Sequence, residues 1–211
     1  MRLMTPLLIA ALAIAGAVIG YTMYGKHQRL QQERAVTALI ADTTTQLRQA
    51  LTATPTKEIF SRIDGNLRSL KAPRQPELAD AAEHYILGAR EIVRRRLDAA
   101  RYAQQAAAGR QALTAHMNAA GGGRRGEAWF RTALDLKKRV ERDHFDLDVT
   151  LKALYELLGS LPDAEKRLAP HVQPALLLEE PLRLQARSQA RADAERAAAE
   201  LEKVRRLAEA R

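Results

Sequence analysis

Cysteine is absent from this chain of 211 residues. Its absence excludes disulfides, thiolate metal sites and a thiol nucleophile. It also excludes a bacterial lipoprotein, because the lipid of such a protein is carried on a cysteine. Aromatic residues make up only 4% of the chain, and Val and Ile never alternate with polar residues over the length of a strand. These shortages argue against a sheet core and favour long helices rich in Ala and Leu.

Signatures of nucleotide binding and of serine hydrolysis are also missing. The chain holds no G-x-S-x-G and no dinucleotide-binding glycine fingerprint. The glycine-rich stretch at 121–126, GGGRRG, lacks the Lys-Ser/Thr pair of a phosphate-binding loop and follows a predicted helix. We interpret it as a connection between two antiparallel helices.

The five histidines are scattered, and one of them has a spacing known from metal sites. Glu141 and His144 form an E-x-x-H, which di-iron helix bundles use in pairs. The nearest candidate for a second half, at residues 80–84, has the wrong spacing. We therefore interpret His144 as a residue at the edge of a helical seam. The sequence predicts no catalytic residue, no metal site and no cofactor, and we do not expect an enzyme.

An uncharged apolar run occupies residues 6–24. Its 19 residues would span ~28 Å as a helix, close to the ~30 Å hydrocarbon core of a bilayer. Arg2 precedes the run, and Lys26 and Arg29 follow it. We predict an uncleaved transmembrane anchor over residues 1–25. A cleaved signal peptide is the alternative, because small-residue pairs such as Ala15-x-Ala17 resemble a cleavage site.

Within this run, Gly16 and Gly20 form a G-x-x-x-G spacing. Two glycines on one helix face let a second helix approach closely in the membrane. The spacing therefore indicates a homo-oligomer formed through the transmembrane helix, although Ala- and Gly-rich spans also produce it by chance.

The orientation of the anchor has two interpretations. Lys and Arg are more numerous after the span than before it, which favours a cytoplasmic body. A short basic head before an apolar segment is instead typical of a signal anchor that exports the body, and we favour this interpretation. We thus expect a single-pass protein of a bacterial inner membrane with a periplasmic body. The net charge of +9 indicates attraction to anionic membrane lipid, whereas nucleic acid is not expected as a partner.

The rest of the chain predicts an all-α fold: an elongated antiparallel bundle or coiled coil at 26–169, a Pro-interrupted apolar segment at 170–184, and a charged helix at 185–211. Apolar residues recur at helical spacing over about 26–53, 55–70, 76–119 and 127–158. Within these ranges we expect Thr54 to cap the second helix, residues 64–66 to bend or break it, and Gly159 to end the fourth. Ser160 and Pro162 then begin a short fifth helix.

Two clusters are candidates for partner or lipid contact. Arg94, Arg95 and Arg96 form the densest basic cluster, and Leu176, Leu177 and Leu178 form an apolar cluster between prolines. Packing within the bundle is the alternative role for the leucines. The last helix has a weak apolar seam, so we expect it to pack lightly or to need a second chain.

From these features we expect a membrane-anchored structural or adaptor protein that acts by protein–protein contacts. Two other hypotheses stay open. One is a helical sensory or ligand-binding module. The other is a cytoplasm-facing binder of anionic lipid or nucleic acid.

Overall fold

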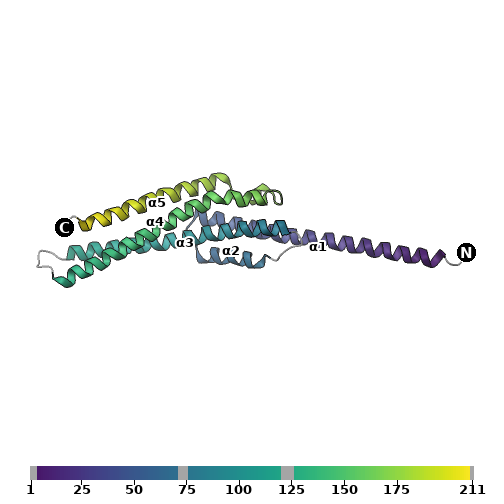
Figure 1. The fold of residues 1–211 in the computed structure, drawn as a ribbon, viewed down its shortest axis with the longest axis horizontal. Coiled ribbons are helices and arrows are strands. Elements are labelled where there is room, and N and C mark those ends of the chain that lie inside the picture. Colours follow the sequence, from purple (N-terminus) through teal and green to yellow (C-terminus); the bar gives the residue numbers. More distant parts are fainter. Residues whose placement is uncertain (1–3, 71–75, 120–125, 210–211) are drawn as a thin grey trace.

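The computed structural model describes the backbone of residues 4–70, 76–119 and 126–209, and the side chains of these ranges from residue 21 to residue 206. Every regular element in these ranges is a helix, which confirms the all-α prediction. The elements are α1 (Met4–Thr52), α2 (Lys57–Ser69), α3 (Pro76–Ala119), α4 (Glu127–Leu168), the short 3₁₀ helix η1 (Pro174–Leu176) and α5 (Glu180–Glu209). They form an elongated body from which the first half of α1 projects (Figure 1).

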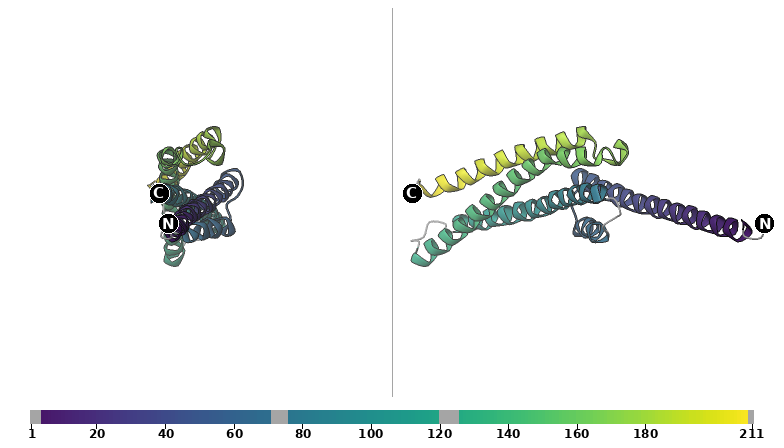
Figure 2. Two further views of the ribbon diagram at one scale, coloured as in Figure 1. Left: turned by 90° about the vertical axis from the view of Figure 1, so that its right-hand side faces the viewer. Right: turned by 45° about the vertical axis from the view of Figure 1, so that its right-hand side comes forward.

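Helix α1 is a single helix of 49 residues, ~74 Å long at 1.5 Å per residue. Its second half lies against α2 and α3, and its first half extends away from every other element (Figures 1 and 2). Among the described side chains, Val36 is the first that is buried, and Ile40, Leu47 and Ala50 follow it on the same face. The predicted helix at 26–53 is thus the packed end of a longer helix.

The antiparallel pair α3 and α4 is the centre of the body (Figure 1). The first half of α3 is fully buried at Tyr85, Ile86, Ile92 and Val93, because α1 and α2 cover it. The predicted seam of α4 is confirmed at Val140, His144, Leu151, Leu154 and Leu158, all of which are buried.

One polar chain links three parts of this core. The Thr44 hydroxyl donates to the Leu176 carbonyl oxygen (2.7 Å) and accepts from the Tyr85 hydroxyl (2.8 Å). Burial raises the pKa of Tyr85 to about 12, so the tyrosine remains a neutral donor. These hydrogen bonds link α1, α3 and η1.

Helix α5 folds back along α4 and buries a stripe of small and apolar residues against it (Figure 2). The stripe consists of Ala190, Ala194, Ala197, Leu201 and Val204. The weak apolar seam of α5 therefore packs against α4 of the same chain. Its start is fixed by Arg183, whose guanidinium contacts the buried Glu165 carboxylate of α4 at 2.5 Å.

Helix α2 differs from the prediction in its N-cap residue and at residues 64–66. Its N-cap is Thr56, not Thr54, because the Thr56 side chain accepts a hydrogen bond from the Ile59 amide (3.4 Å). Asp64, Gly65 and Asn66 do not break α2, which continues through them to Ser69. Their polar side chains are bound elsewhere: Asn66 donates to Asp42 of α1 (2.8 Å) and Asp64 accepts from Arg90 of α3 (2.7 Å). These contacts hold the triplet in the helix.

The prediction that α4 ends at Gly159 is wrong, since α4 runs to Leu168 with Pro162 inside it, and no separate helix begins at Ser160. The apolar seam continues across the proline at Leu158, Leu161 and Leu168, each 2% exposed or less. Burial of these leucines offsets the backbone hydrogen bond that a proline removes. Gly159 serves a close side-chain contact, described below.

Among the side chains that the structure describes, none of the helices combines the length and hydropathy that crossing a bilayer requires. Most of the predicted span at 6–24, including Gly16 and Gly20, lies outside these side chains. The glycine-rich connection, apart from Gly126, and most of the linker before α3 also lie outside the described residues.

Candidate functional site

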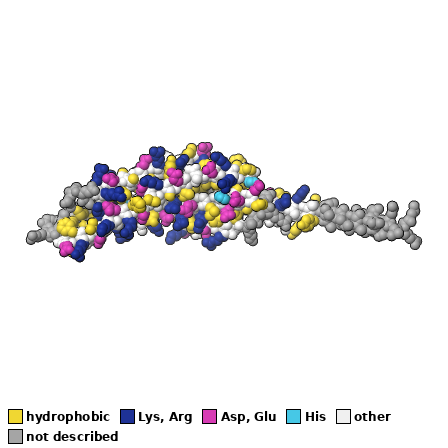
Figure 3. Space-filling model, viewed as in Figure 1, with side chains coloured by type: hydrophobic (Ala, Val, Ile, Leu, Met, Phe, Trp, Pro, Cys, Tyr) yellow, Lys and Arg dark blue, Asp and Glu magenta, His cyan; other side chains and the backbone are white. Residues whose placement is uncertain are grey.

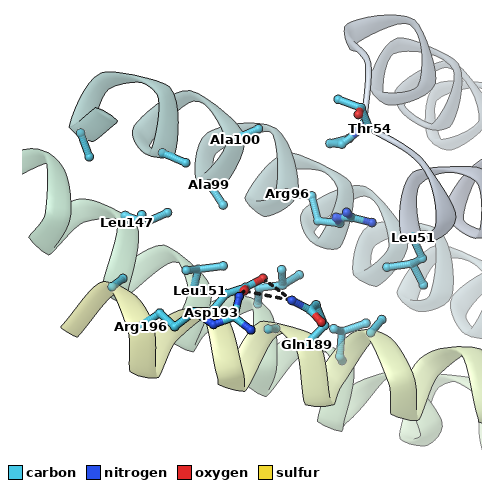
Figure 4. Close-up of a pocket in the computed structure, with 18 of the residues that line it drawn as sticks. Leu51, Thr54, Arg96, Ala99, Ala100, Leu147, Leu151, Gln189, Asp193 and Arg196 are labelled. Carbon is cyan, nitrogen blue, oxygen red and sulfur yellow. Dashed lines mark hydrogen bonds and ion pairs between the residues drawn. The ribbon is translucent and has the colours of Figure 1, made fainter. Parts of the chain in front are cut away.

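A cleft of about 990 Å³ lies between the second half of α3, the middle of α4, and α5. Its volume is at the upper end of the ~300–1,000 Å³ range that is common for small-molecule sites. Leu147 and Leu151 of α4 face Ala99 and Ala100 of α3, and α5 supplies the third wall (Figure 4). The end of α1 and the following residues, from Leu51 to Pro55, close the cleft toward the core.

The cleft exists because the α3 wall consists of alanines. Ala99, Ala100, Ala103 and Ala106 line it, whereas the covered first half of α3 buries large side chains among its alanines, namely Leu78, Tyr85, Ile86, Ile92 and Val93. The helices still approach each other closely at one point. A Cβ atom at Gly109 would lie 2.9 Å from the Val140 side chain, closer than carbon atoms pack, so glycine permits this crossing.

The outer end of the cleft is polar. Arg110 of α3 and Glu200 of α5 form an ion pair across it (2.7 Å). His144 lines the same end, with only 3% of its surface exposed. Among the described residues, neither ring nitrogen of His144 has a hydrogen-bond partner. Burial lowers the pKa of His144, and the charge of Arg110 lowers it further, so the ring is neutral at pH 7.

The inner end of the cleft carries a cation. Arg96 of α3 lies beside Leu51 (Figure 4) and donates to the Ala50 carbonyl oxygen in the last turn of α1. A cation at this position also interacts favourably with the helix dipole. Among the described residues, no carboxylate lies within ion-pair distance of Arg96, and burial lowers the pKa of its guanidinium. Asp193 across the cleft is held instead by Arg196 (3.0 Å) and Gln189 (2.9 Å).

A cation–π contact between α4 and α5 lies directly beside Gly159. The Arg187 guanidinium lies over the Tyr155 ring, 4.2 Å from its centroid. A Cβ atom at position 159 would lie 2.9 Å from the same guanidinium. Gly159 therefore makes room for a cation–π contact that holds the third wall of the cleft.

The structure separates the three arginines predicted as one cluster. Arg94 is exposed beside Glu91 (3.7 Å) and Asp98 (4.0 Å), and Arg95 pairs with Glu91 at 2.9 Å. Only Arg96 faces the cleft, because consecutive residues on a helix point about 100° apart. The basic cluster is thus not one surface.

The three leucines after Pro174 lie against the core. Leu178 is 5% exposed, and Leu176 and Leu177 are half-buried against the same hydrophobic cluster. Their packing closes the body where α4 turns into α5.

Glu141 and His144 do not form half of a metal centre with the residues around them. Among the described residues, no group of three or more His, Asp or Glu side chains is arranged to hold a metal ion. His84, on the other candidate segment, is exposed, and its Nδ1 atom lies 2.9 Å from the Asp80 carbonyl oxygen of its own helix.

The cleft was not predicted from the sequence, although one signal pointed to it. The apolar stripe of α3 thins to alanine after Leu97, which either lets a neighbouring helix come close or leaves space. Which of these occurs depends on where α5 lies, and the sequence does not give this position.

Comparisons with protein-family models, with curated proteins and with solved structures find no match for this chain. Chemically, the cleft offers two apolar walls and one partly polar wall, with the Arg96 cation at one end and, at the other, the His144 imidazole beside the Arg110–Glu200 ion pair.

Proposed function

We propose that this protein is a membrane-anchored helical adaptor that presents its body to a protein partner at a distance from the bilayer. The observation that carries the proposal is the length and placement of α1. The helix is continuous over 49 residues, and its first half extends beyond the body (Figure 2). An apolar run at 6–24 on this part of the chain suits a single-pass anchor, and the remainder up to Val36 would act as a stiff stalk.

The opposite end of the molecule supports a role in protein contacts. There, at the start of α4, Trp129 stacks on His116 of α3 with ring centroids 5.0 Å apart, and Phe130 packs edge-on against Trp129. Phe130 is 57% exposed and Leu134 is 48% exposed. Over the rest of the visible body surface, charges of both signs are interspersed (Figure 3). Exposed aromatic and aliphatic side chains at a tip are suited to bind a partner.

The first test is the topology of the full chain in cells. A carboxy-terminal tag is followed in spheroplasts treated with protease, and the size of the chain on a gel reports whether residues 1–25 are retained. We expect an uncleaved chain that is digested from outside. A chain that is protected until lysis would place the body in the cytoplasm and favour the lipid- or nucleic-acid-binding alternative.

The second test concerns the tip. A photoreactive amino acid at position 130 should crosslink to one discrete partner in cells, and Leu134→Asp should abolish this product. The matched control is position 87, because Leu87 is also an exposed leucine (41%) but lies on the first half of α3, away from the tip. Equal products at both positions would contradict a partner site at the tip. Crosslinking only to a second copy of this chain would replace the adaptor role with a homo-oligomer formed at the tip. Pairing of the transmembrane helix through Gly16 and Gly20 is a separate proposal.

A further inference from the structure

The cleft between α3, α4 and α5 has features of a binding site beyond its volume. Small residues along a helix do not by themselves make a site. Here, however, the trough ends at His144, a residue that is only 3% exposed and whose two ring nitrogens have no hydrogen-bond partner among the described residues. Leaving a buried polar group unpaired costs ~1–3 kcal/mol, and a ligand group that reached one of these nitrogens would remove this cost.

The shape of the cleft selects an elongated ligand. Arg96 and Arg110, at its two ends, are 14 residues apart on α3, which corresponds to ~21 Å of helix. Between these ends, Ala of α3 and Leu of α4 form two apolar walls, and the α5 wall adds the polar side chains of Gln185, Gln189, Asp193 and Arg196. One leaflet of a bilayer core, the depth of one acyl chain, is ~15 Å. An extended alkyl chain therefore fits the trough with room for a polar group at each end.

The two ends of the cleft select different polar groups. At the inner end, the Arg96 guanidinium donates to the Ala50 carbonyl oxygen and keeps further N–H donors. Among the described residues, no carboxylate forms an ion pair with it, and the charge of Asp193 across the cleft acts on it from a greater distance. A carboxylate is the group that this fork binds best. At the outer end, a neutral imidazole has one donor and one acceptor, which matches a hydroxyl. A second carboxylate is disfavoured there, because Glu200 lines the same end.

We propose that the cleft binds a long-chain hydroxy acid, with its carboxylate on Arg96, its alkyl chain along the alanine and leucine walls, and its distal hydroxyl on His144. The site goes beyond the adaptor role and does not depend on it, because it uses neither α1's projecting half nor the tip at Phe130. Ligand binding would join α3 to α5, which contact each other across the cleft through the Arg110–Glu200 pair.

The test uses the full chain in lipid nanodiscs and a diazirine analogue of hexadecanoic acid as the photolabel. The label should enter peptides that cover 99–106 and 147–158. Unlabelled 16-hydroxyhexadecanoic acid should compete about fivefold better than hexadecanoic acid, because only the former reaches His144. Hexadecyltrimethylammonium should not compete. Labelling confined to residues 6–24, or equal competition by the cation, would overturn the proposal.

Variants then separate the two ends. His144→Phe should remove the preference for the hydroxy acid while retaining the binding of hexadecanoic acid. Arg96→Gln should weaken both acids about tenfold, the loss expected for one charge-assisted contact, and Arg96→Lys should restore part of it. Unchanged affinities in these variants would refute the assigned roles.

Two alanine-to-tryptophan variants distinguish a blocked cleft from a failure to fold. Ala103 lines the cleft and Ala107 does not, and both are exposed alanines on the same helix. Ala103→Trp should block labelling of the cleft peptides, whereas Ala107→Trp should leave it intact. Equal labelling of the two variants would show that the acid binds elsewhere. A change of oligomeric state in Ala103→Trp alone would assign the cleft to a second copy of the chain and would also overturn the proposal.

Discussion

At the scale of single residues, glycines in similar helices have different roles. A Cβ atom at Gly65 of α2 would meet nothing within 4 Å, whereas one at Gly109 of α3 would lie 2.9 Å from the branched Val140 side chain. The general gain from replacing a helical glycine with alanine, up to ~1 kcal/mol, therefore applies only at the first position.

We expect Gly65→Ala to raise the free energy of unfolding by ~0.5–1 kcal/mol and Gly109→Ala to lower it by ~1–3 kcal/mol, because the second variant overpacks the α3–α4 crossing. Denaturant unfolding followed by circular dichroism measures both. If both variants changed stability in the same direction, the α3–α4 crossing at Val140 would accommodate the added methyl group without a loss of stability.

His144 gives the stability of the protein a dependence on pH. Burial lowers its pKa in the folded state below the ordinary histidine value of 6.5, so the unfolded chain binds the proton first as the pH falls. Stability contributed by the neutral ring is present above pH ~6.5 and is lost as the pH falls below that value. Arg110 strengthens this effect, while Glu200 and Asp143 oppose it.

The wild-type chain should thus lose more unfolding free energy between pH 7.5 and pH 5.5 than His144→Leu, which has no proton to bind. The variant should be at least as stable at pH 7.5, because it removes an unpaired polar group from the cleft. Glu165, whose pKa burial raises, acts in both proteins and cancels in the difference. Parallel pH profiles for the two chains would contradict the buried neutral imidazole.

At the scale of elements, α5 depends on a few specific contacts, since its own apolar seam is weak. The Glu165–Arg183 pair is the most buried of these, with side chains 11% and 12% exposed. A buried pair that loses one partner leaves an uncompensated charge, whereas an exposed pair contributes little because water screens it. The Arg191–Glu195 pair of the same helix, with side chains 68% and 66% exposed, is of the second kind.

Arg183→Ala should therefore lower the free energy of unfolding by ~3–5 kcal/mol, and Arg191→Ala should change it by less than ~0.5 kcal/mol. Thermal unfolding of the two variants in the same buffer is the measurement. Similar melting temperatures would indicate that α5 is held mainly by its alanine stripe.

At the scale of the whole molecule, α5 is part of the folded body. It covers α4, closes one wall of the cleft and supplies the partner of Glu165. We expect a chain that stops at Glu179 to lose ~3 kcal/mol or more of stability, because Glu165 would then be left without its cation. Addition of a separate peptide of residues 180–211 should recover part of the lost melting temperature. An unchanged melting temperature after truncation would show α5 to be an independent arm.

Sequence periodicity predicted the long helices but not every point where they begin or end. The extent of α3, from Pro76 to Ala119, was predictable because its apolar spacing and the proline at its start both act locally. The end of α4 was not, because Gly159 and Pro162 are local signals that burial of Leu158, Leu161 and Leu168 overrides. In the same way, contacts of Asp64 and Asn66 with α3 and α1 override the turn preference of their own segment.

The sequence predicted some residues of the candidate site but not their arrangement. The thinning of α3 to alanine and the presence of His144 on the seam of α4 are visible in the sequence. The cleft itself depends on α5 folding back beside α4, on Arg96 pointing inward while Arg94 and Arg95 point elsewhere, and on the Arg110–Glu200 contact between residues 90 positions apart.

The sequence by itself determined that this chain is helical, because helix propensity and apolar spacing act over one or two turns of the backbone. The tertiary structure decided where α5 lies and which polar side chains lost access to water. The physical reason is that the burial of His144, Arg96 and Glu165 depends on surfaces contributed by distant helices, and the free energy of these contacts exists only once the helices have packed together.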